Sequence, residues 1–346
     1  MVSRRKEHEA YLNKVLSNSL TSENPSKETM QKGKKSSSSF YNDLKNGLLK
    51  KYENTKFEDF PNTNICENQY GETLKIVSKE KTDFNLESNS DSVTCDLKII
   101  KGIGQSTEEK LKKSGYNNIQ SLLNHAKYSS KAENVLSNIE TDNFKDKINY
   151  IKENSSNKNN LLKCACDIPR ENFKFMDIET LGLSNVPIIL IGMAEINKKE
   201  IITTQYLLRD KNEEPALIYE FLNQLNEDDV FVTFNGKSFD VPFILNRANY
   251  YRINFPDELI NYDLMYYARN FWKDTLPDCK LQTIEKEIFN IERINDVPGN
   301  FIPNYWETFH ENNNIGPLIP IIEHNNLDVV NLAKFLNYMY NKTCSL

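Results

Sequence analysis

Four acidic residues in the C-terminal half of the chain stand where their side chains could share one site. Asp177 and Glu179 end an alternating stretch expected to be a strand, and residues two apart in a strand point to the same face. Asp240 follows a buried apolar stretch, and Asp328 lies in an expected helix. Four converging carboxylates would repel one another, so such a cluster predicts bound cations.

The chemistry that this set could support is the hydrolysis of a phosphodiester bond. Two divalent ions about 4 Å apart would activate water and hold the leaving oxygen. Mg²⁺ and Mn²⁺ prefer oxygen ligands, so we expect two such ions, with nucleic acid as the partner. His324 lies four residues before Asp328 and shares its helix face, where an imidazole could take the proton of the attacking water.

The elements that must position these residues follow from the apolar pattern. Two adjacent strands joined by a turn at 197–199 indicate a hairpin, and helices and strands alternate after it. The expected strands are 73–77, 173–176, 187–196, 201–208 and 230–234, and the expected helices are 40–52, 213–225, 238–251, 281–289 and 318–340. This order predicts an α/β fold with a mixed sheet flanked by helices. Four aromatic residues are expected to belong to its core: Phe173, Phe175, Phe231 and Phe234.

Each acidic residue also has an ordinary structural interpretation. Asp177 and Glu179 could be solvent-exposed residues at a strand end, and Asp240 could cap the helix that follows it. Asn235 could be a turn residue, and His324 could be a surface histidine. The order of the residues along the chain, with each on a suitable element, favours a shared site.

Three sequence blocks resemble the three exonuclease motifs of the DEDD superfamily, in order: DIET at 177–180, NGKSFD at 235–240 and HNNLD at 324–328. A finer similarity is to bacterial and archaeal predicted exonucleases with a ribonuclease-H-like domain. In these proteins, as here, three further blocks precede the last motif: LQTIE at 281–285, IER at 291–293 and DVPG at 296–299. The resemblance covers residues 171–342.

This resemblance implies a ribonuclease-H-like fold with a mixed five-stranded sheet, preceded by a small, mostly helical N-terminal region. It also implies 3′–5′ exonuclease activity, with four metal ligands and a general base: Asp177, Glu179, Asp240, Asp328 and, as the base, His324. DEDD enzymes carry either a Tyr three residues clear of the last Asp or a His four residues clear. This chain has a His at the Tyr-type spacing, so the alternatives for His324 are to orient water, contact phosphate or cap the helix.

A second feature, the turn Gly102-Ile103-Gly104, resembles a helix-hairpin-helix motif. Glycines let a backbone approach a phosphate, and the helix that follows would attract it. A capping box at Ser106 and Glu109 predicts where that helix starts, Gly115 predicts its end, and Ile119–Ala126 is expected to begin the next helix. The residues expected to contact nucleic acid are Gly102, Ile103, Gly104, Lys112, Lys113 and, in the NGKSFD block, Asn235, with Lys101 and Lys110 as further cations. The alternative is a packing turn without a ligand.

Composition places these parts in order along the chain. Residues 1–38 are expected to form a flexible polar tail with a helix near 5–18. Residues 39–160 would form the N-terminal region, with the helix-hairpin-helix-like segment at 96–127 and a linker at 128–160, and residues 168–346 the exonuclease domain. Residues 1–160 hold 26 Lys and Arg against 22 Asp and Glu, whereas the rest hold 17 against 27. A mildly basic half beside an acidic half suits phosphate contact beside a metal site.

The cellular setting is expected to be the cytoplasm. The sequence lacks a run of about 18 apolar residues, so no membrane span is expected, and the charged start MVSRRKEHEA does not resemble a secretory signal. Six sparse cysteines fit free thiols, with a zinc site at Cys164 and Cys166 as the less favoured alternative.

Two other functions fit the same residues. The domain could bind nucleic acid without cutting it, or it could be a structure-specific endonuclease that uses the same ions. The residues leave open whether DNA or RNA is the substrate. Three further cations are candidates for phosphate contact: Lys237, Arg247 and Arg293.

Overall fold

The computed structural model describes residues 37–60, 62–87 and 91–344. Nearly all of the expected tail at 1–38, with its helix near 5–18, lies outside these residues. The chain divides after Leu44 into two compact units, and the second, Lys45–Leu346, contains every described strand. Within the described ranges, the helices lack the combination of length and apolar character that crossing a bilayer requires.

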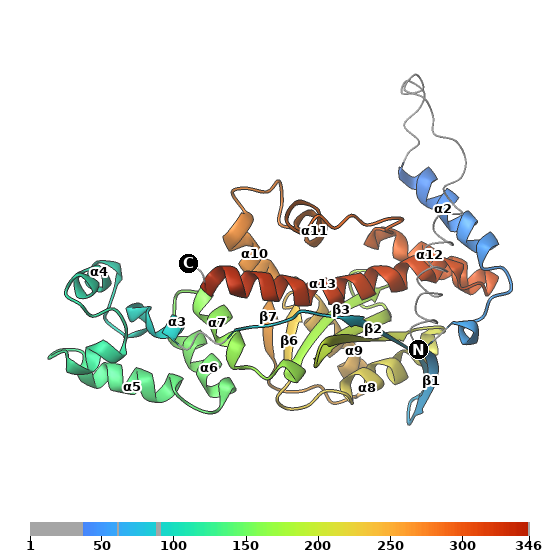
Figure 1. Cartoon of the computed structure of the whole chain (residues 1–346). Helices are drawn as coiled ribbons and strands as arrows, with labels where there is room; N and C mark the ends of the chain where they lie inside the picture. Colours follow the sequence, from blue (N-terminus) through green and yellow to red (C-terminus); the bar gives the residue numbers. More distant parts are fainter. Residues whose placement is uncertain (1–36, 61, 88–90, 345–346) are drawn as a thin grey trace, which may run out of the picture. The chain divides into compact units, whose positions relative to one another are not determined.

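One mixed sheet of seven strands organises the second unit, in the order β1-β2-β5-β4-β3-β6-β7 (Figure 1). The strands are β1 (Thr63–Asn68), β2 (Gly71–Lys81), β3 (Phe173–Thr180), β4 (Ile188–Asn197), β5 (Glu200–Leu207), β6 (Val230–Thr233) and β7 (Ile260–Asp263). Pairing is antiparallel from β1 to β3, and β6 and β7 continue the sheet parallel to β3. The predicted fold class, an α/β fold with a mixed sheet flanked by helices, is confirmed.

The sheet has seven strands rather than the expected five, because β1 and β7 were not among the expected strands. The hairpin of β1 and β2 joins the sheet at its edge. β2 pairs with β5 over eight residues, from Leu74 opposite Leu207 to Lys81 opposite Glu200. Gly71 opens β2 at φ +120°, a left-handed value that favours glycine. The preceding strand, β1, has the polar sequence TNICEN, which lacks the apolar alternation that would have predicted a strand.

Helices cover both faces of the sheet (Figure 1). The long helix α13 packs across β3, β4 and β5, while α8 and α9 pack together on the opposite face. The helices of this domain are α8 (Glu214–Leu222), α9 (Asp240–Tyr251), α10 (Leu264–Trp272), α11 (Leu281–Phe289), α12 (Ile302–Asn312) and α13 (Ile319–Cys344). Phe173, Phe175 and Phe231 are fully buried, as expected, and Phe234 packs half-buried against the core.

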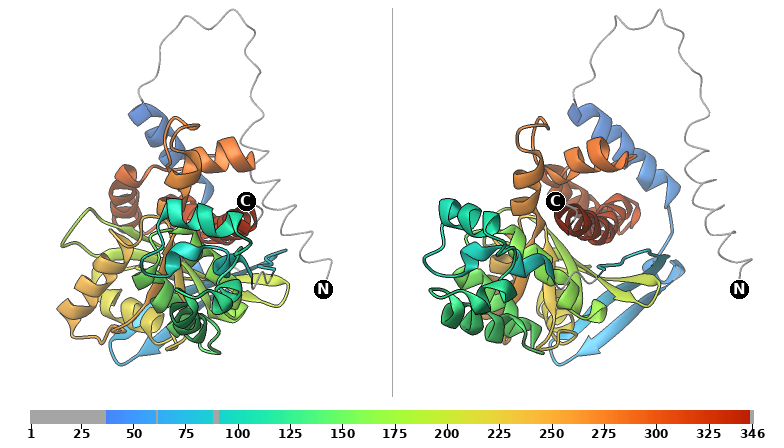
Figure 2. Two further views of the ribbon diagram at one scale, coloured as in Figure 1. Left: turned by 90° about the vertical axis from the view of Figure 1, so that its left-hand side faces the viewer. Right: turned by 60° about the vertical axis from the view of Figure 1, so that its left-hand side comes forward.

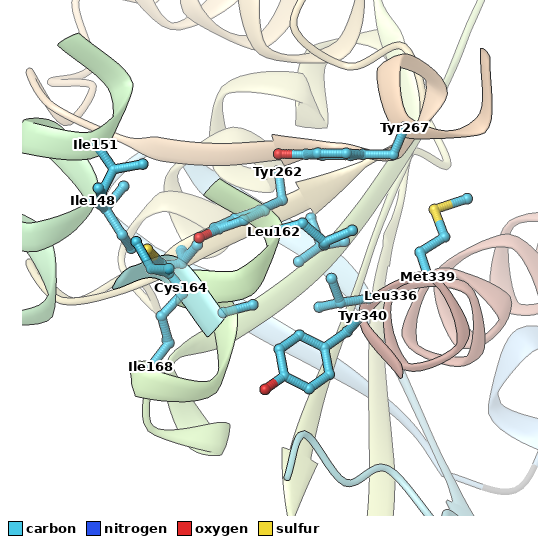
Figure 3. Packing of buried hydrophobic residues seen from close by; sticks show 14 of the residues in the cluster. Ile148, Ile151, Leu162, Cys164, Ile168, Tyr262, Tyr267, Leu336, Met339 and Tyr340 are labelled. Atoms are coloured by element: carbon cyan, nitrogen blue, oxygen red, sulfur yellow. The ribbon is translucent and has the colours of Figure 1, made fainter. Parts of the chain in front are cut away.

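A group of short helices gathers at one end of the sheet (Figure 2). These helices are α3 (Asp91–Thr94), α4 (Gln105–Lys113), α5 (Ser129–Ile139), α6 (Phe144–Asn154) and α7 (Asn159–Lys163). A separate helix, α2 (Ser37–Lys51), precedes β1 in the chain. Residues 128–160, whose polar composition suggested a linker, therefore form helices. Their few apolar side chains, among them Ile148 and Ile151, are buried in the same cluster as Tyr262 of β7 and Tyr340 of α13 (Figure 3).

The helix after the Gly102–Gly104 turn is capped two residues earlier than the capping box at Ser106 predicted. Gly104 is its N-terminal cap, and the amides of Thr107 and Glu108 donate to the Gly104 carbonyl. Its end is as expected: Gly115 takes φ +94°, and Tyr116 donates to the Leu111 carbonyl. The helix expected at Ile119–Ala126 is a short 3₁₀ turn, Gln120–Asn124.

Arg247, expected as a possible phosphate contact, is instead engaged by a buried carboxylate. Glu214 at the start of α8 is fully buried and accepts hydrogen bonds from Arg247 Nε at 2.8 Å and from the Tyr251 hydroxyl at 2.7 Å. It also accepts from the Ile188 amide at 2.9 Å. Glu214 therefore links α8, α9 and β4, and the guanidinium of Arg247 stabilises the packing of these elements.

Replacing Glu214 with alanine should lower the free energy of unfolding by about 3–5 kcal/mol, because Arg247 would keep a largely buried charge without its partner. Urea denaturation measures this difference. Glu200→Ala, at an exposed strand end, is the control and should change stability by less than about 0.5 kcal/mol. Equal stabilities of the two variants would contradict a structural role for the Glu214 network.

Candidate active site

The four acidic residues come from three elements and meet in one cluster. Asp177 and Glu179 lie on β3, Asp240 is the first residue of α9, and Asp328 lies in α13. One Asp240 oxygen accepts the Ile178 amide at 3.1 Å, which holds α9 against β3. His324 Nε2 lies 3.2 Å from an Asp328 oxygen and 3.6 Å from a Glu179 oxygen. We call Asp177, Glu179, Asp240 and Asp328 the acid cluster.

Burial and repulsion make three carboxylates of the acid cluster, those of Asp177, Glu179 and Asp240, hard to ionise. Burial, and then the charges of Asp328, Asp240 and Glu179, raise the pKa of Asp177 well above its ordinary value. Burial raises the pKa of Glu179 to about 8, against the opposing charge of His324. Burial also raises the pKa of Asp240 to about 7, although the hydrogen bond from Ile178 opposes this. Positive charge placed among these oxygens would therefore be strongly stabilised.

Part of that positive charge comes from Arg293. Its guanidinium donates to the fully buried carboxylate of Glu285 through Nε at 2.6 Å and Nη2 at 2.7 Å, and it also contacts Asp328. Asn331 donates to the same Glu285 carboxylate at 2.7 Å. The sequence singled out Arg293 but not Glu285 or Asn331, which hold it at the acid cluster.

The acid cluster has the oxygen ligands that Mg²⁺ and Mn²⁺ prefer, and its repulsion fits divalent cations. As the side chains stand, however, no set of three or more His, Cys, Asp or Glu residues in the described ranges is arranged to hold a metal ion. Asp328 has Arg293 and His324 as partners instead. At the Cys164–Cys166 pair, burial raises the pKa of the Cys164 thiol to about 12.

His324 lies inside α13, so it does not cap the helix. Its Nδ1 is bound to Asp296, which leaves Nε2 facing Glu179 and Asp328. Burial by itself would lower the pKa of His324, but the hydrogen bonds with Asp296 and Asp328 and the charge of Glu179 raise it to about 11. The imidazole is therefore fixed in orientation and carries a positive charge in this arrangement.

A buried amide, Asn325, positions Asp177 and was not among the site residues expected from the sequence. Asn325 Nδ2 donates to the Asp177 side chain at 3.0 Å and to its carbonyl at 3.1 Å. Its Oδ1 accepts from Gln205 Nε2 at 2.9 Å. Asp177 pairs with Gly192 across β3 and β4, and Gly192 pairs with Gln205 across β4 and β5, so Asn325 lies over this row of three strands.

Gly192 makes this arrangement possible. A Cβ atom at Gly192 would lie 2.0 Å from Asn325 Oδ1, which no packed structure tolerates. A glycine inside the apolar run IILIGMAEI was therefore a usable signal, because glycine in a strand often marks a close approach.

The loop before Asp240 is held by another missed residue, Asp263. Its buried carboxylate accepts the amides of Asn235 at 2.8 Å and Lys237 at 3.1 Å. Asn235 takes the left-handed φ of +68°. A Cβ atom at Gly236 would lie 2.4 Å from that of Thr233, so the NGKSFD turn needs its glycine.

The residues near the Gly102–Gly104 turn that were expected to contact nucleic acid lie in and just before α4, in the helical region ahead of β3. Gly102 takes φ +100°, whereas the Ile103 side chain is buried and its amide donates to the Ile100 carbonyl. Lys112 forms an ion pair with Glu108 at 3.1 Å, and Lys113 is exposed. Among the described contacts, none joins Gly102, Ile103, Gly104, Lys112 or Lys113 to the acid cluster.

Comparison with known proteins agrees with the fold. Residues 174–340 match the family model described as the RNase_H superfamily, and this stretch contains the whole acid cluster. Residues 174–340 form a ribonuclease-H-like domain. The chain is also 32% identical over 181 residues to the uncharacterized protein YprB of Bacillus subtilis (strain 168). That alignment covers 51% of this chain and 44% of the relative, so the chain matches less than half of the relative's length.

Replacing Gly192 with alanine should lower the free energy of unfolding by about 1–3 kcal/mol, because Asn325 must move to admit the methyl group. Thermal or urea unfolding measures the change. Gly299→Ala is the matched control, since a Cβ there meets nothing within 4 Å. If both alanine variants were equally stable, the close packing of Asn325 over Gly192 would be disproved.

Proposed function

We propose that this protein is a metal-dependent nuclease that hydrolyses phosphodiester bonds of DNA or RNA from the 3′ end. The observation that carries the proposal is the acid cluster, four carboxylates from β3, α9 and α13 within the ribonuclease-H-like domain. The similarity of the DIET, NGKSFD and HNNLD blocks to the DEDD exonucleases supports the polarity. The order of these blocks matches the elements that bring the carboxylates together.

Asp177, Glu179, Asp240 and Asp328 would hold two Mg²⁺ or Mn²⁺ ions. When bound, such ions make hydroxide available near neutral pH and neutralise charge on the leaving oxygen. The repulsion that raises the pKa values of Asp177, Glu179 and Asp240 supports this assignment, because cations relieve it. Asn325 keeps the Asp177 carboxylate in one orientation, so it is a positioning residue.

Arg293 and His324 complete the proposed chemistry. Glu285 anchors the guanidinium, so Arg293 can exchange Asp328 for a phosphate oxygen of the substrate. Asp296 fixes the ring of His324 through Nδ1, and Nε2 faces the acid cluster. From this position His324 can accept the proton of the attacking water once substrate and ions have changed its surroundings.

The Gly102–Gly104 turn would bind the nucleic-acid backbone at a point remote from the acid cluster. The open space beside Gly104 at the start of α4 and the exposed Lys113 support this role. The amide and side chain of Ile103 serve the fold, so phosphate contact would come from Gly102, Gly104 and the lysines.

A digest of end-labelled single- and double-stranded DNA and RNA tests the proposal. Wild type should release nucleotides from the 3′ end with Mg²⁺ or Mn²⁺ and stop with chelator. Asp177→Asn and Asp328→Asn should each lower the rate by roughly 100-fold or more, because loss of even an outer partner of a metal site costs about 10–100-fold. Asp257→Asn, at an exposed position, is the control and should retain the wild-type rate.

Circular single strands separate the alternatives in the same assay. An exonuclease leaves circles intact, whereas a structure-specific endonuclease cuts them. A wild type that degrades none of the substrates with either metal would contradict the proposal and favour a binding module without catalysis.

Metal binding should also stabilise the folded protein. At a metal concentration about 100 times Kd, the free energy of unfolding should rise by about 2.7 kcal/mol, and the melting temperature should rise with it. Asp177→Ala combined with Asp240→Ala should abolish this gain without unfolding the apoprotein, because it removes unfavourably buried carboxylates. Differential scanning fluorimetry with Mn²⁺ and with chelator measures both effects. A gain that persists in the double variant would place the ions elsewhere.

A further inference from the structure

Two lysines from separate parts of the chain lie over one aromatic ring, and the charge of a third acts on one of them. Lys158 Nζ lies 5.4 Å and Lys237 Nζ lies 5.9 Å from the ring centre of Tyr266 at the start of α10. Partial burial of the Lys237 ammonium lowers its pKa, and the neighbouring charges of Lys152 and Lys158 lower it further. We call Lys152, Lys158 and Lys237 the lysine patch.

Rigid elements hold the lysine patch together. Lys152 lies on α6, which buries Ile148 and Ile151 in the cluster that contains Tyr262 (Figure 3). Lys158 directly precedes α7, and the Tyr262 hydroxyl donates to the Leu161 carbonyl of α7 at 2.9 Å. The backbone of Lys237 is fixed by its hydrogen bond to Asp263. The three ammonium groups are therefore close because of the fold.

The positive charge of the lysine patch is poorly compensated. Across the residues that the structure describes, none of the three lysines forms an ion pair with a carboxylate. The acid that raises the pKa of Lys237 is Asp263, but its oxygens already accept the backbone amides of Asn235, Lys237 and Met265. All three lysines are exposed, so an anion from solution can reach them.

The lysine patch adjoins the acid cluster. Lys237 stands three residues before Asp240 in the NGKSFD turn, and Asp263 is near enough to Asp240 to raise its pKa. Lys152 and Lys158 belong to the helical region, so the lysine patch continues from the ribonuclease-H-like domain onto α6 and α7. A chain of phosphates leaving the acid cluster would meet these lysines next.

We propose that Lys152, Lys158 and Lys237 bind backbone phosphates of the nucleic-acid strand beside the acid cluster. This assignment rests on the proposed nuclease function and names the surface that holds its substrate. Ammonium groups spread over two regions suit successive phosphates of a polymer, and such contacts are independent of base sequence. Tyr266 holds two of the ammonium groups over its ring and so keeps them in place.

Fluorescence anisotropy with a labelled single-stranded oligonucleotide tests the lysine patch, with chelator present so that nothing is cleaved. Lys158→Gln with Lys237→Gln should weaken binding roughly tenfold, and the slope of log K against log salt should fall by about 0.7 for each lysine removed. Lys158→Arg with Lys237→Arg should keep wild-type binding. Lys211→Gln is the matched control, since Lys211 is an exposed lysine 5.6 Å from the Trp306 ring centre and outside the patch.

The outcomes separate this proposal from the nuclease function. Wild-type affinity and salt slope in the double Gln variant would overturn the lysine patch, even if the protein degrades nucleic acid. Binding lost in the Gln variant and kept in the Arg variant supports the patch, even if no metal yields cleavage. A wild type without affinity for any oligonucleotide overturns both.

Discussion

The repulsion among four buried carboxylates is the constraint on which the rest of this domain depends. Three of the four carboxylates are held in place by a neighbour: the Ile178 amide for Asp240, Asn325 for Asp177, His324 and Arg293 for Asp328. Keeping these negative charges together lowers the stability of the fold, which is common where a site must bind cations. In the described arrangement Arg293 and His324 supply positive charge.

These two cations have different anchors. Arg293 is hydrogen-bonded to Glu285, which is itself hydrogen-bonded to Asn331. These contacts fix the guanidinium at the edge of the acid cluster. His324 is fixed by Asp296 on the segment after α11. The residues that lie between the second and third acidic motifs in the sequence therefore supply the second layer of the site. This layer explains why a site of four acids needs the long segment from 281 to 299.

The acid cluster could be predicted from sequence because each member lies in a local pattern: a strand end, a turn after a buried strand, and a helix. Gly192, Gln205 and Asn325 were missed because their link to Asp177 depends on the register of three strands and the docking of α13. Arg247 was misjudged for a related reason, since its buried partner Glu214 is 33 residues away in the chain. The polar strand β1 gave no apolar pattern, so the sheet was expected to be smaller.

The most direct test of this account is a crystal structure with Mn²⁺, using anomalous scattering to find the ions. The account predicts two manganese peaks about 4 Å apart among Asp177, Glu179, Asp240 and Asp328, with Arg293 displaced from Asp328. Crystals saturated with Mn²⁺ that show no peak among these carboxylates, with Arg293 still bound to Asp328, would contradict it.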